Sequence, residues 1–187
     1  MTELALINQG KVKSVYDIIN DPQKVHITFH DKVTAWNGKH VEFPEDKGKI
    51  CCLISALLFE MLEKNGIKTH YINCPSLNTM ECKKLTIIPL EVIVRNIAAG
   101  SIVKNTNITE GQLINPPIVE FFLKDDSKND PLLTIDRVRL MGIDPTPLQV
   151  NALDINYQLQ SLFTLCGIDL VDFKLEFGYD SHGDLFL

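Results

Sequence analysis

The sequence has no excess of positive charge. Its 187 residues include 18 Lys and Arg against 24 Asp and Glu, which gives a formal net charge of −6. Proteins that bind nucleic acids or anionic membranes without specificity are normally basic, so the composition argues against both partners. An acidic protein can still bind phosphate groups where a few lysines and arginines converge.

Long apolar stretches are also missing. No window approaches the roughly 18 apolar residues that a membrane-spanning helix needs. Residues 1–6 lack the basic region and the apolar run of a secretory signal. We therefore expect no membrane partner and a cytoplasmic location.

Motifs of several common enzyme classes do not occur. There is no Gly-x-Gly-x-x-Gly and no Walker-type loop, so neither usual phosphate cradle applies. There are five cysteines, which is an odd number, and no two of them form a Cys-x-x-Cys pair. We interpret them as reduced thiols, and not as a disulfide framework or a zinc site. None of the five histidines is assigned a catalytic role.

The chain does contain enough apolar material for a core. Hydrophobic residues make up 45% and charged residues 22%, which is typical of folded domains. Val25, Ile27 and Phe29 alternate with polar residues, and this pattern predicts a half-buried strand. We expect a turn before it at residues 20–22, a pairing with residues 10–16, another turn at Asn37-Gly38, and further strands near residues 69–73, 81–88 and 90–96.

Two segments have helical periodicity. The first covers residues 49–65 and ends at Asn65-Gly66. The second covers residues 147–166, with Thr146 as the expected N-cap and Gly167 as the stop. Residues 104–147 contain five prolines and are interpreted as loops with short helices. Antiparallel strands with inserted helices favour an α+β fold over a doubly wound parallel sheet.

The segment most suggestive of chemistry is residues 170–178. In a strand, Asp172, Lys174 and Glu176 share one face, with the two carboxylates roughly 13 Å apart and the lysine between them. Such a face could hold a metal–nucleotide complex, with carboxylates for Mg²⁺ and an ammonium group for a phosphate oxygen. An ordinary solvated face of an amphipathic strand has the same pattern, and the pattern alone favours that interpretation.

Other segments suggest phosphate binding more weakly. Lys11 and Lys13 would share a strand face beside Gly10, although the pattern by itself favours exposed charge on an edge strand. Arg95 ends an apolar strand and is followed by Ser101, a pairing suited to a phosphate monoester or to a structural ion pair before a tight loop.

An acidic loop at Lys124-Asp125-Asp126 could bind a metal or an amine. A solvated loop is the simpler interpretation of this segment.

Taken together and in order, these segments resemble the phosphoribosylaminoimidazole-succinocarboxamide (SAICAR) synthetase family. The matching motifs span nearly the whole chain. The most specific are the run from Pro89 to Ser101 and the Asp-Phe-Lys-Leu-Glu-Phe-Gly run at residues 172–178. The others are Gly10-Lys11-x-Lys13-x-x-Tyr16, Trp36-Asn37-Gly38-Lys39 and the Lys124-Asp125-Asp126 loop.

The resemblance implies a two-lobed α+β fold related to ATP-grasp and protein-kinase folds. Residues 1–85 would form a nucleotide-binding lobe and residues 86–187 a substrate-binding lobe. The residues that it assigns to the nucleotide are Lys11, Lys13, Lys83, Leu85, Lys124 and Lys174, with residues 80–85 bordering the adenine. Arg95 and Ser101 would hold the ribose 5-phosphate of the imidazole substrate.

The resemblance also implies a catalytic role for Asp172 and Lys174, and magnesium ligation by Glu176 and Glu45. Asp172 would lie near the imidazole or the incoming amine. The expected reaction uses ATP and Mg²⁺ to join L-aspartate to carboxyaminoimidazole ribotide, giving SAICAR, ADP and phosphate. The expected partners are these small molecules, with no nucleic acid, and the protein could form a homo-oligomer.

The chain departs from the family pattern in three places. Cys51-Cys52 replaces two asparagines, and residues 76–81 differ from the usual Ser-Asp-Thr-Glu-like stretch. Family members also continue beyond the equivalent of Leu187, with a magnesium-binding aspartate and a phosphate-binding arginine. From this third departure we expect a truncated chain with reduced ligase activity, and the alternative to an active ligase is a nucleotide-binding remnant.

Overall fold

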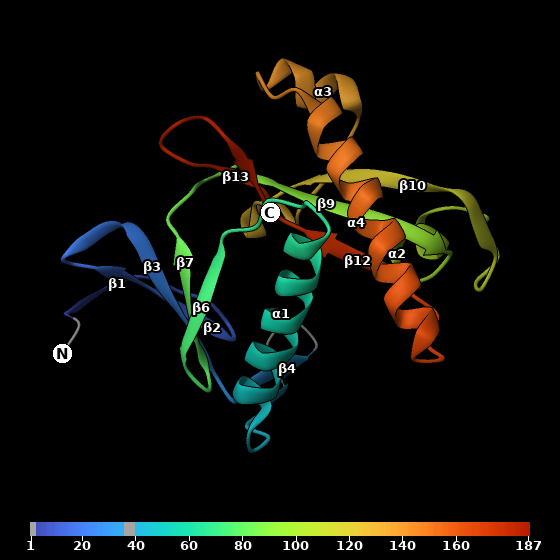
Figure 1. Cartoon of the computed structure of the whole chain (residues 1–187). Coiled ribbons are helices and arrows are strands. Elements are labelled where there is room, and N and C mark those ends of the chain that lie inside the picture. The colour runs from blue at the N-terminus through green and yellow to red at the C-terminus, as the bar shows by residue number, and fades with distance from the viewer. Residues whose placement is uncertain (1–2, 36–39) are drawn as a thin grey trace. The chain divides into compact units, whose positions relative to one another are not determined.

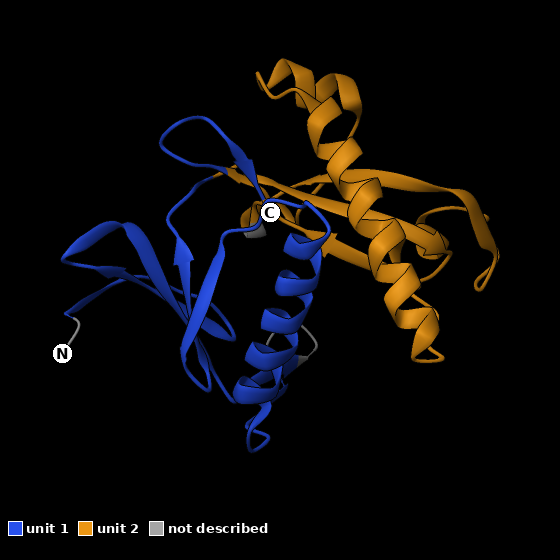
Figure 2. Ribbon diagram, viewed as in Figure 1, with its two compact units in different colours: residues 1–86, 179–186 blue, residues 87–178, 187 orange. Residues whose placement is uncertain are grey.

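Residues 3–35 and 40–187 are described by a computed structural model, in which the chain divides into two units (Figure 2). Unit 1 comprises residues 1–86 and 179–186, and unit 2 comprises residues 87–178 and 187. Helices are mixed with antiparallel sheets in the chain, which confirms the α+β class.

Unit 1 is built on a five-stranded antiparallel sheet. Its strands, in spatial order, are β1 (Leu4–Gln9), β2 (Lys13–Ile18), β3 (Asp21–Phe29), β7 (Thr79–Lys83) and β6 (Tyr71–Ser76). The predicted strand at residues 25–29 is part of β3, which buries Val25 and Phe29 and pairs with β2 as expected. Strand β1 was not predicted.

A small hairpin of β4 (Val33–Ala35) and β5 (His40–Glu42) belongs to the same unit. The predicted Asn37-Gly38 turn, like the Trp36–Lys39 motif, lies outside the described residues. The turn expected at residues 20–22 occurs slightly earlier, at Ile19 and Asn20, because Asp21 and Pro22 already belong to β3.

Helix α1 (Lys47–Lys64) packs on this sheet, and its predicted end at Asn65 is confirmed. The helix approaches β3 so closely at Gly48 that a Cβ atom there would lie 2.7 Å from the Phe29 carbonyl oxygen. Its buried residues include Cys52, Ala56 and Leu62. Four of the larger apolar residues whose spacing predicted the helix are between 48% and 66% exposed, namely Ile50, Leu53, Ile54 and Leu57. Periodicity therefore identified the helix but not its buried side.

Unit 2 has a four-stranded sheet covered on one face by a long helix (Figure 1). The strands, in spatial order, are β11 (Leu132–Leu133), β10 (Leu113–Leu123), β9 (Leu90–Ile97) and β12 (Asp172–Leu175). Helix α4 (Pro145–Leu165) packs on β9 and β10 and buries Leu148, Ala152, Ile155 and Leu159. The remaining elements of unit 2 are α2 (Ser101–Asn105), η1 (Asp126–Lys128) and α3 (Ile135–Leu140). A separate small sheet, which is not confined to unit 2, has the order β14 (Leu185–Phe186), β13 (Gly178–Tyr179) and β8 (Thr86–Ile87).

The prediction of loops and short helices over residues 104–147 was wrong for residues 113–123. These residues form β10, the longest strand of the sheet. Pro116 and Pro117, which suggested a loop, lie where the pairing with β9 shifts register between Leu113 and Ile118. A register irregularity tolerates residues that cannot donate to the ladder, so the strand continues on both sides of the prolines.

The predicted start of the second helix was also wrong by two residues. Helix α4 begins at Pro145, and its N-cap is Asp144, whose side chain accepts a hydrogen bond from the Thr146 amide at 2.9 Å. Asp144 is as good a capping residue as Thr146 and places a proline at the first helical position. The predicted end is confirmed, with Cys166 as the C-cap and Gly167 at φ 71°.

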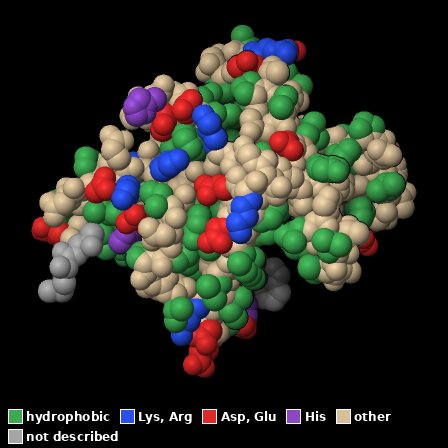
Figure 3. All heavy atoms as spheres, viewed as in Figure 1, with side chains coloured by type: hydrophobic (Ala, Val, Ile, Leu, Met, Phe, Trp, Pro, Cys, Tyr) green, Lys and Arg blue, Asp and Glu red, His purple; other side chains and the backbone are tan. Residues whose placement is uncertain are grey.

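No helix in the described part of the chain is long and apolar enough to cross a membrane. On the face shown in Figure 3, acidic and basic side chains lie near one another instead of gathering by sign. The described residues on that face form no continuous basic patch.

A buried pair of amides joins α4 to β9. The Asn96 and Asn156 side chains each donate to the other's oxygen, at 2.8 and 2.9 Å. Asn96 Nδ2 also donates to the Leu170 carbonyl at 3.0 Å, and its backbone amide donates to the Val171 carbonyl at 2.9 Å. The pair therefore fixes the chain immediately before β12.

Replacement of Asn156 by leucine should destabilise the fold, because it leaves the buried Asn96 amide without its partner on α4. We expect a loss of about 2 kcal/mol in the free energy of unfolding, measured by equilibrium urea denaturation followed by circular dichroism. Asn151→Leu on the same helix is the matched control, since the Asn151 side chain donates to the Pro147 carbonyl of its own helix. Equal losses in the two variants would contradict a special role for the amide pair.

Candidate functional site

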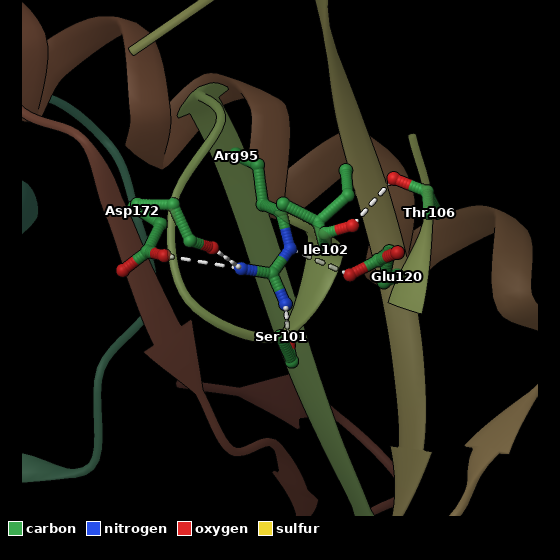
Figure 4. Close-up of polar contacts among 7 residues, drawn as sticks. Arg95, Ser101, Ile102, Thr106, Glu120 and Asp172 are labelled. Carbon is green, nitrogen blue, oxygen red and sulfur yellow. Dashed lines mark hydrogen bonds and ion pairs between the residues drawn. The ribbon is translucent and has the colours of Figure 1, made fainter. Parts of the chain in front are cut away.

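The candidate site lies on the face of the unit 2 sheet that α4 does not cover. Side chains alternate along a strand, so Asn96 points toward α4 while Arg95 points to the opposite face. Asp172 of β12 stands directly opposite Arg95 in the register, and Glu120 comes from β10 on the other side. Three adjacent strands thus bring their polar side chains together around one guanidinium group (Figure 4).

Arg95 is 3% exposed and donates in four directions. Its Nε donates to Glu120 Oε2 at 2.6 Å, and its Nη1 donates to Asp172 Oδ2 at 3.1 Å and to the Ala99 carbonyl at 3.4 Å. Its Nη2 donates to Ser101 Oγ at 2.8 Å. A buried charge is tolerated when it is paired and hydrogen-bonded, and two carboxylates satisfy that condition here.

The turn after β9 delivers Ser101 to the guanidinium. Gly100 precedes α2 with φ 64° and ψ −125°, a conformation that essentially only glycine adopts. Ser101 is exposed although it contacts a buried arginine. Its oxygen accepts from Arg95, and a hydroxyl that accepts in this way can donate its own hydrogen to a ligand.

The three residues predicted to hold or adjoin the imidazole substrate, Arg95, Ser101 and Asp172, are therefore brought together by the fold. The alternative interpretation of Arg95, a structural ion pair before a tight loop, describes the same contacts. The geometry is compatible with both, because a preorganised structural pair can also orient a neighbouring ligand group.

Two more ion pairs lie along β12 and beyond its end. Lys174 pairs with Glu91 of β9, and Lys124 pairs with Glu176. Asp172, Lys174 and Glu176 are all exposed, whereas Leu175 and Phe177 are buried, which confirms the predicted alternation of faces. Each of the three polar residues has a partner of opposite charge, so the face is neutralised pair by pair.

The Lys124 loop is held by local contacts. Hydrogen bonds from Lys128 and Ser127 lower the pKa of the Asp125 carboxyl from its ordinary value. Asp130 Oδ1 accepts from the Asp125 amide at 2.8 Å. These contacts hold the loop together locally. Lys124 is the residue of the loop that contacts Glu176, which directly follows β12.

The remaining predicted nucleotide contacts belong to unit 1. Lys11 precedes β2, so the expectation that it shares a strand face with Lys13 was wrong. The reason is a tight turn before β2, in which the Gly10 amide donates a hydrogen bond to the Lys13 carbonyl at 2.8 Å. The Lys13 ammonium group lies 4.6 Å from the Phe29 ring centroid.

Some residues of the segment predicted to border the adenine, residues 80–85, are buried in the core. Met80 and Cys82 are 1% and 0% exposed, so their side chains belong to the unit 1 core. Lys83 is exposed, with its ammonium group 4.2 Å from the Phe186 ring centroid, and Leu85 is half-buried. Glu45 is exposed in the segment before α1.

The sequence did not identify Glu91, Glu120, Asn96 or Asn156 as parts of this arrangement. Glu120 falls in the segment mistaken for a loop, and the β-branched and aromatic residues at 118, 119, 121 and 122 were the strand signal that could have found it. Asn156 carries no local signal, because its partner is 60 positions away in the chain. Among the described residues, no group of three His, Cys, Asp or Glu could hold a metal ion.

Comparisons with known proteins agree with the motifs. A family model described as SAICAR synthetase matches residues 6–187. The phosphoribosylaminoimidazole-succinocarboxamide synthase of Synechocystis sp. is 49% identical over 183 residues, which cover 96% of this chain and 69% of that protein. The enzyme of the same name from Prochlorococcus marinus is 46% identical and is matched over 100% of this chain and 78% of its own.

Solved structures give the same result. A SAICAR synthetase (Type-2) in complex with ADP superposes with a TM-score of 0.91 and 37% identity, covering 99% of this chain and 78% of that one. The phosphoribosylaminoimidazole-succinocarboxamide synthase from Ehrlichia chaffeensis gives a TM-score of 0.92 at 37% identity, covering 98% and 80%. The match extends through the sheet that carries Arg95 and Asp172, and this chain belongs to the SAICAR synthetase family.

Proposed function

We propose that this protein is an ATP-dependent ligase that joins L-aspartate to 5-amino-1-(5-phosphoribosyl)imidazole-4-carboxylate to give SAICAR, ADP and phosphate. The observation that carries the proposal is the cluster of Arg95, Ser101 and Asp172 on one sheet face, in a chain closely similar to a SAICAR synthetase solved with ADP. The substrates are small molecules, and five free thiols suit a cytoplasmic enzyme.

The chemistry needs an activated carboxylate, because a carboxylate is a poor electrophile at neutral pH. Transfer of the γ-phosphoryl group of ATP to the imidazole carboxylate gives an acyl phosphate and ADP. The aspartate amine then attacks the acyl carbon, phosphate leaves, and the nitrogen loses a proton as the amide forms. No protein nucleophile is required, so the protein acts by alignment and charge stabilisation.

In the proposed arrangement, Ser101 donates to the ribose 5-phosphate of the imidazole substrate. Arg95 lies behind Ser101, fixes the direction of its hydroxyl, and places positive charge near the phosphate. Asp172 is held in turn by Arg95 at the edge of the site, where it faces the imidazole or the incoming amine. Burial of the guanidinium makes this group rigid, which is the condition for precise alignment.

In unit 2, Lys124 and Lys174 are proposed to contact nucleotide phosphates. The same role is proposed in unit 1 for Lys11, Lys13 and Lys83. Leu85 is proposed to lie beside the adenine. The carboxylates that pair with Lys124 and Lys174 hold these ammonium groups in place until phosphate oxygens replace them. Phosphates carry more charge and more acceptor oxygens than a carboxylate, so the exchange favours the ligand.

One Mg²⁺ is proposed to bind at Glu176, and a second Mg²⁺ near Glu45. Mg²⁺ typically takes one or two protein carboxylates and completes its shell with water and phosphate oxygens. An exposed single carboxylate such as Glu176 fits that requirement without a preformed cluster. Bound Mg²⁺ would supply charge neutralisation on the phosphates.

The proposal predicts ADP release only when ATP, carboxyaminoimidazole ribotide and L-aspartate are all present with Mg²⁺. Each component is omitted in turn, and ADP is measured by a coupled assay. Binding of ATP by the folded protein without ADP release in the complete mixture would instead indicate a nucleotide-binding protein with no ligase activity.

Replacement of Ser101 by alanine should raise the KM for the ribotide about tenfold, because a hydrogen bond to a charged phosphate is lost. The KM for ATP should stay within about twofold of the original value. Ser101→Ala is cleaner than Arg95→Ala, which would leave Glu120 buried without its cation. Ser161→Ala on α4, where the hydroxyl bonds only to the Tyr157 carbonyl, is the matched control. An equal rise in both KM values would argue against the assignment.

Replacement of Glu176 by glutamine should raise the Mg²⁺ concentration needed for half-maximal rate several-fold, because a neutral amide is a weaker ligand for Mg²⁺ than a carboxylate. The measurement is a magnesium titration of the initial rate at saturating substrates. Glu110→Gln, at an exposed turn of unit 2, provides the control. An unchanged magnesium requirement in Glu176→Gln would remove this residue from the metal site.

A further inference from the structure

Four of the five cysteines lie within or against the core of unit 1. Cys51 and Cys52 belong to α1, Cys74 to β6 and Cys82 to β7. Cys52 and Cys82 are fully buried, whereas Cys51 and Cys74 are half-buried. The sequence suggested isolated reduced thiols, but the fold brings distant cysteines together.

Two of these thiols are in direct contact. The sulfur atoms of Cys52 and Cys74, 22 positions apart in the chain, lie 3.9 Å from each other. A disulfide has an S–S distance of about 2 Å, so the sulfurs must approach by roughly 2 Å to bond. The Tyr71 hydroxyl lies 3.9 Å from the Cys74 sulfur and helps to fix that thiol beside Cys52.

Strand β6 is suited to supply the required movement. It is the edge strand of its sheet, so it pairs through one side only, with β7. Its register with β7 shifts between Asn73 and Ser76, the interval that contains Cys74 and Pro75. A strand with an irregular pairing and a proline has fewer ladder hydrogen bonds to lose when it shifts.

We propose that Cys52 and Cys74 form an oxidisable dithiol, which a small-molecule disulfide such as oxidised glutathione converts into an intramolecular disulfide between α1 and β6. The pair is independent of the ligase residues of unit 2.

The reaction starts at Cys74. Its thiolate attacks one sulfur of oxidised glutathione, a mixed disulfide forms, and the first glutathione leaves as a thiolate. The Cys52 sulfur then attacks the Cys74 sulfur and displaces the second glutathione, which takes up the Cys52 proton. The protein loses two electrons and two protons, and one oxidised glutathione becomes two molecules of glutathione.

The order of the two thiols follows from their surroundings. Burial, together with the neighbouring Cys74 sulfur, raises the pKa of the Cys52 thiol to about 12, so Cys52 stays protonated at neutral pH. A buried, protonated thiol cannot initiate exchange with a solute. Cys74 is half-buried and is therefore the more accessible of the two thiols, and Cys52 then resolves the mixed disulfide from inside the core.

The test is incubation of the folded protein with oxidised glutathione, followed by denaturation in acid and labelling with N-ethylmaleimide. Intact mass spectrometry should show the loss of two hydrogens and labels on three of the five cysteines, with all five labelled after dithiothreitol. Tryptic digestion should link the peptide of residues 50–64 to that of residues 69–83. Retention of glutathione as a stable mixed disulfide, or no oxidation, would overturn the proposal.

Single variants identify the bonded pair, because each tryptic peptide contains two cysteines. The link should persist in Cys51→Ser and Cys82→Ser and disappear in Cys52→Ser and Cys74→Ser. Circular dichroism checks that each variant folds, and Cys52→Ala replaces Cys52→Ser if the hydroxyl is not tolerated in the core. A link that survives removal of Cys52 or Cys74 would show a different pairing and refute the assignment.

Discussion

The arrangement of unit 2 depends on one buried charge. Arg95 is almost completely removed from solvent, and a guanidinium group in that position requires carboxylates at hydrogen-bonding distance. Glu120 and Asp172 meet this requirement only when β10 and β12 both pair with β9 in the observed register. The electrostatic need of one side chain therefore selects the alignment of three strands, and the same alignment collects the polar groups of the proposed site.

The opposite face of the sheet supports this alignment with apolar packing and one polar contact. Val92, Val94 and Phe121 are buried on the side that α4 covers. The paired amides of Asn96 and Asn156 lie on that side and hold the chain just before Asp172. The two faces are thus coupled through adjacent residues of β9, because Asn96 orients toward the helix and Arg95 toward the site.

The features of the fold and of the site that depend on neighbouring residues in the chain could be predicted from the sequence. The alternation of Asp172, Lys174 and Glu176 with apolar residues predicted one polar face, and the run to Ser101 marked the arginine. The carboxylate partners could not be predicted, since they depend on which strands become neighbours. Prolines obscured β10, and the large apolar residues of α1 indicated a helix without showing that the smaller Cys52 and Ala56 face the sheet. Local patterns identify elements, whereas partners are set by contacts between distant segments.

The separation of Arg95 and Asp172 along the chain has a consequence for the order in which the unit assembles. The two residues are 77 positions apart, and β12 has only four residues to secure its place beside β9. Contacts of such long range form late, after local helices and hairpins. A slip of β12 by one residue would turn Phe173 and Leu175 outward and leave the arginine with Glu120 as its single carboxylate partner. The polar face is therefore complete only in chains whose edge strand β12 has docked correctly, so binding competence reports on finished folding.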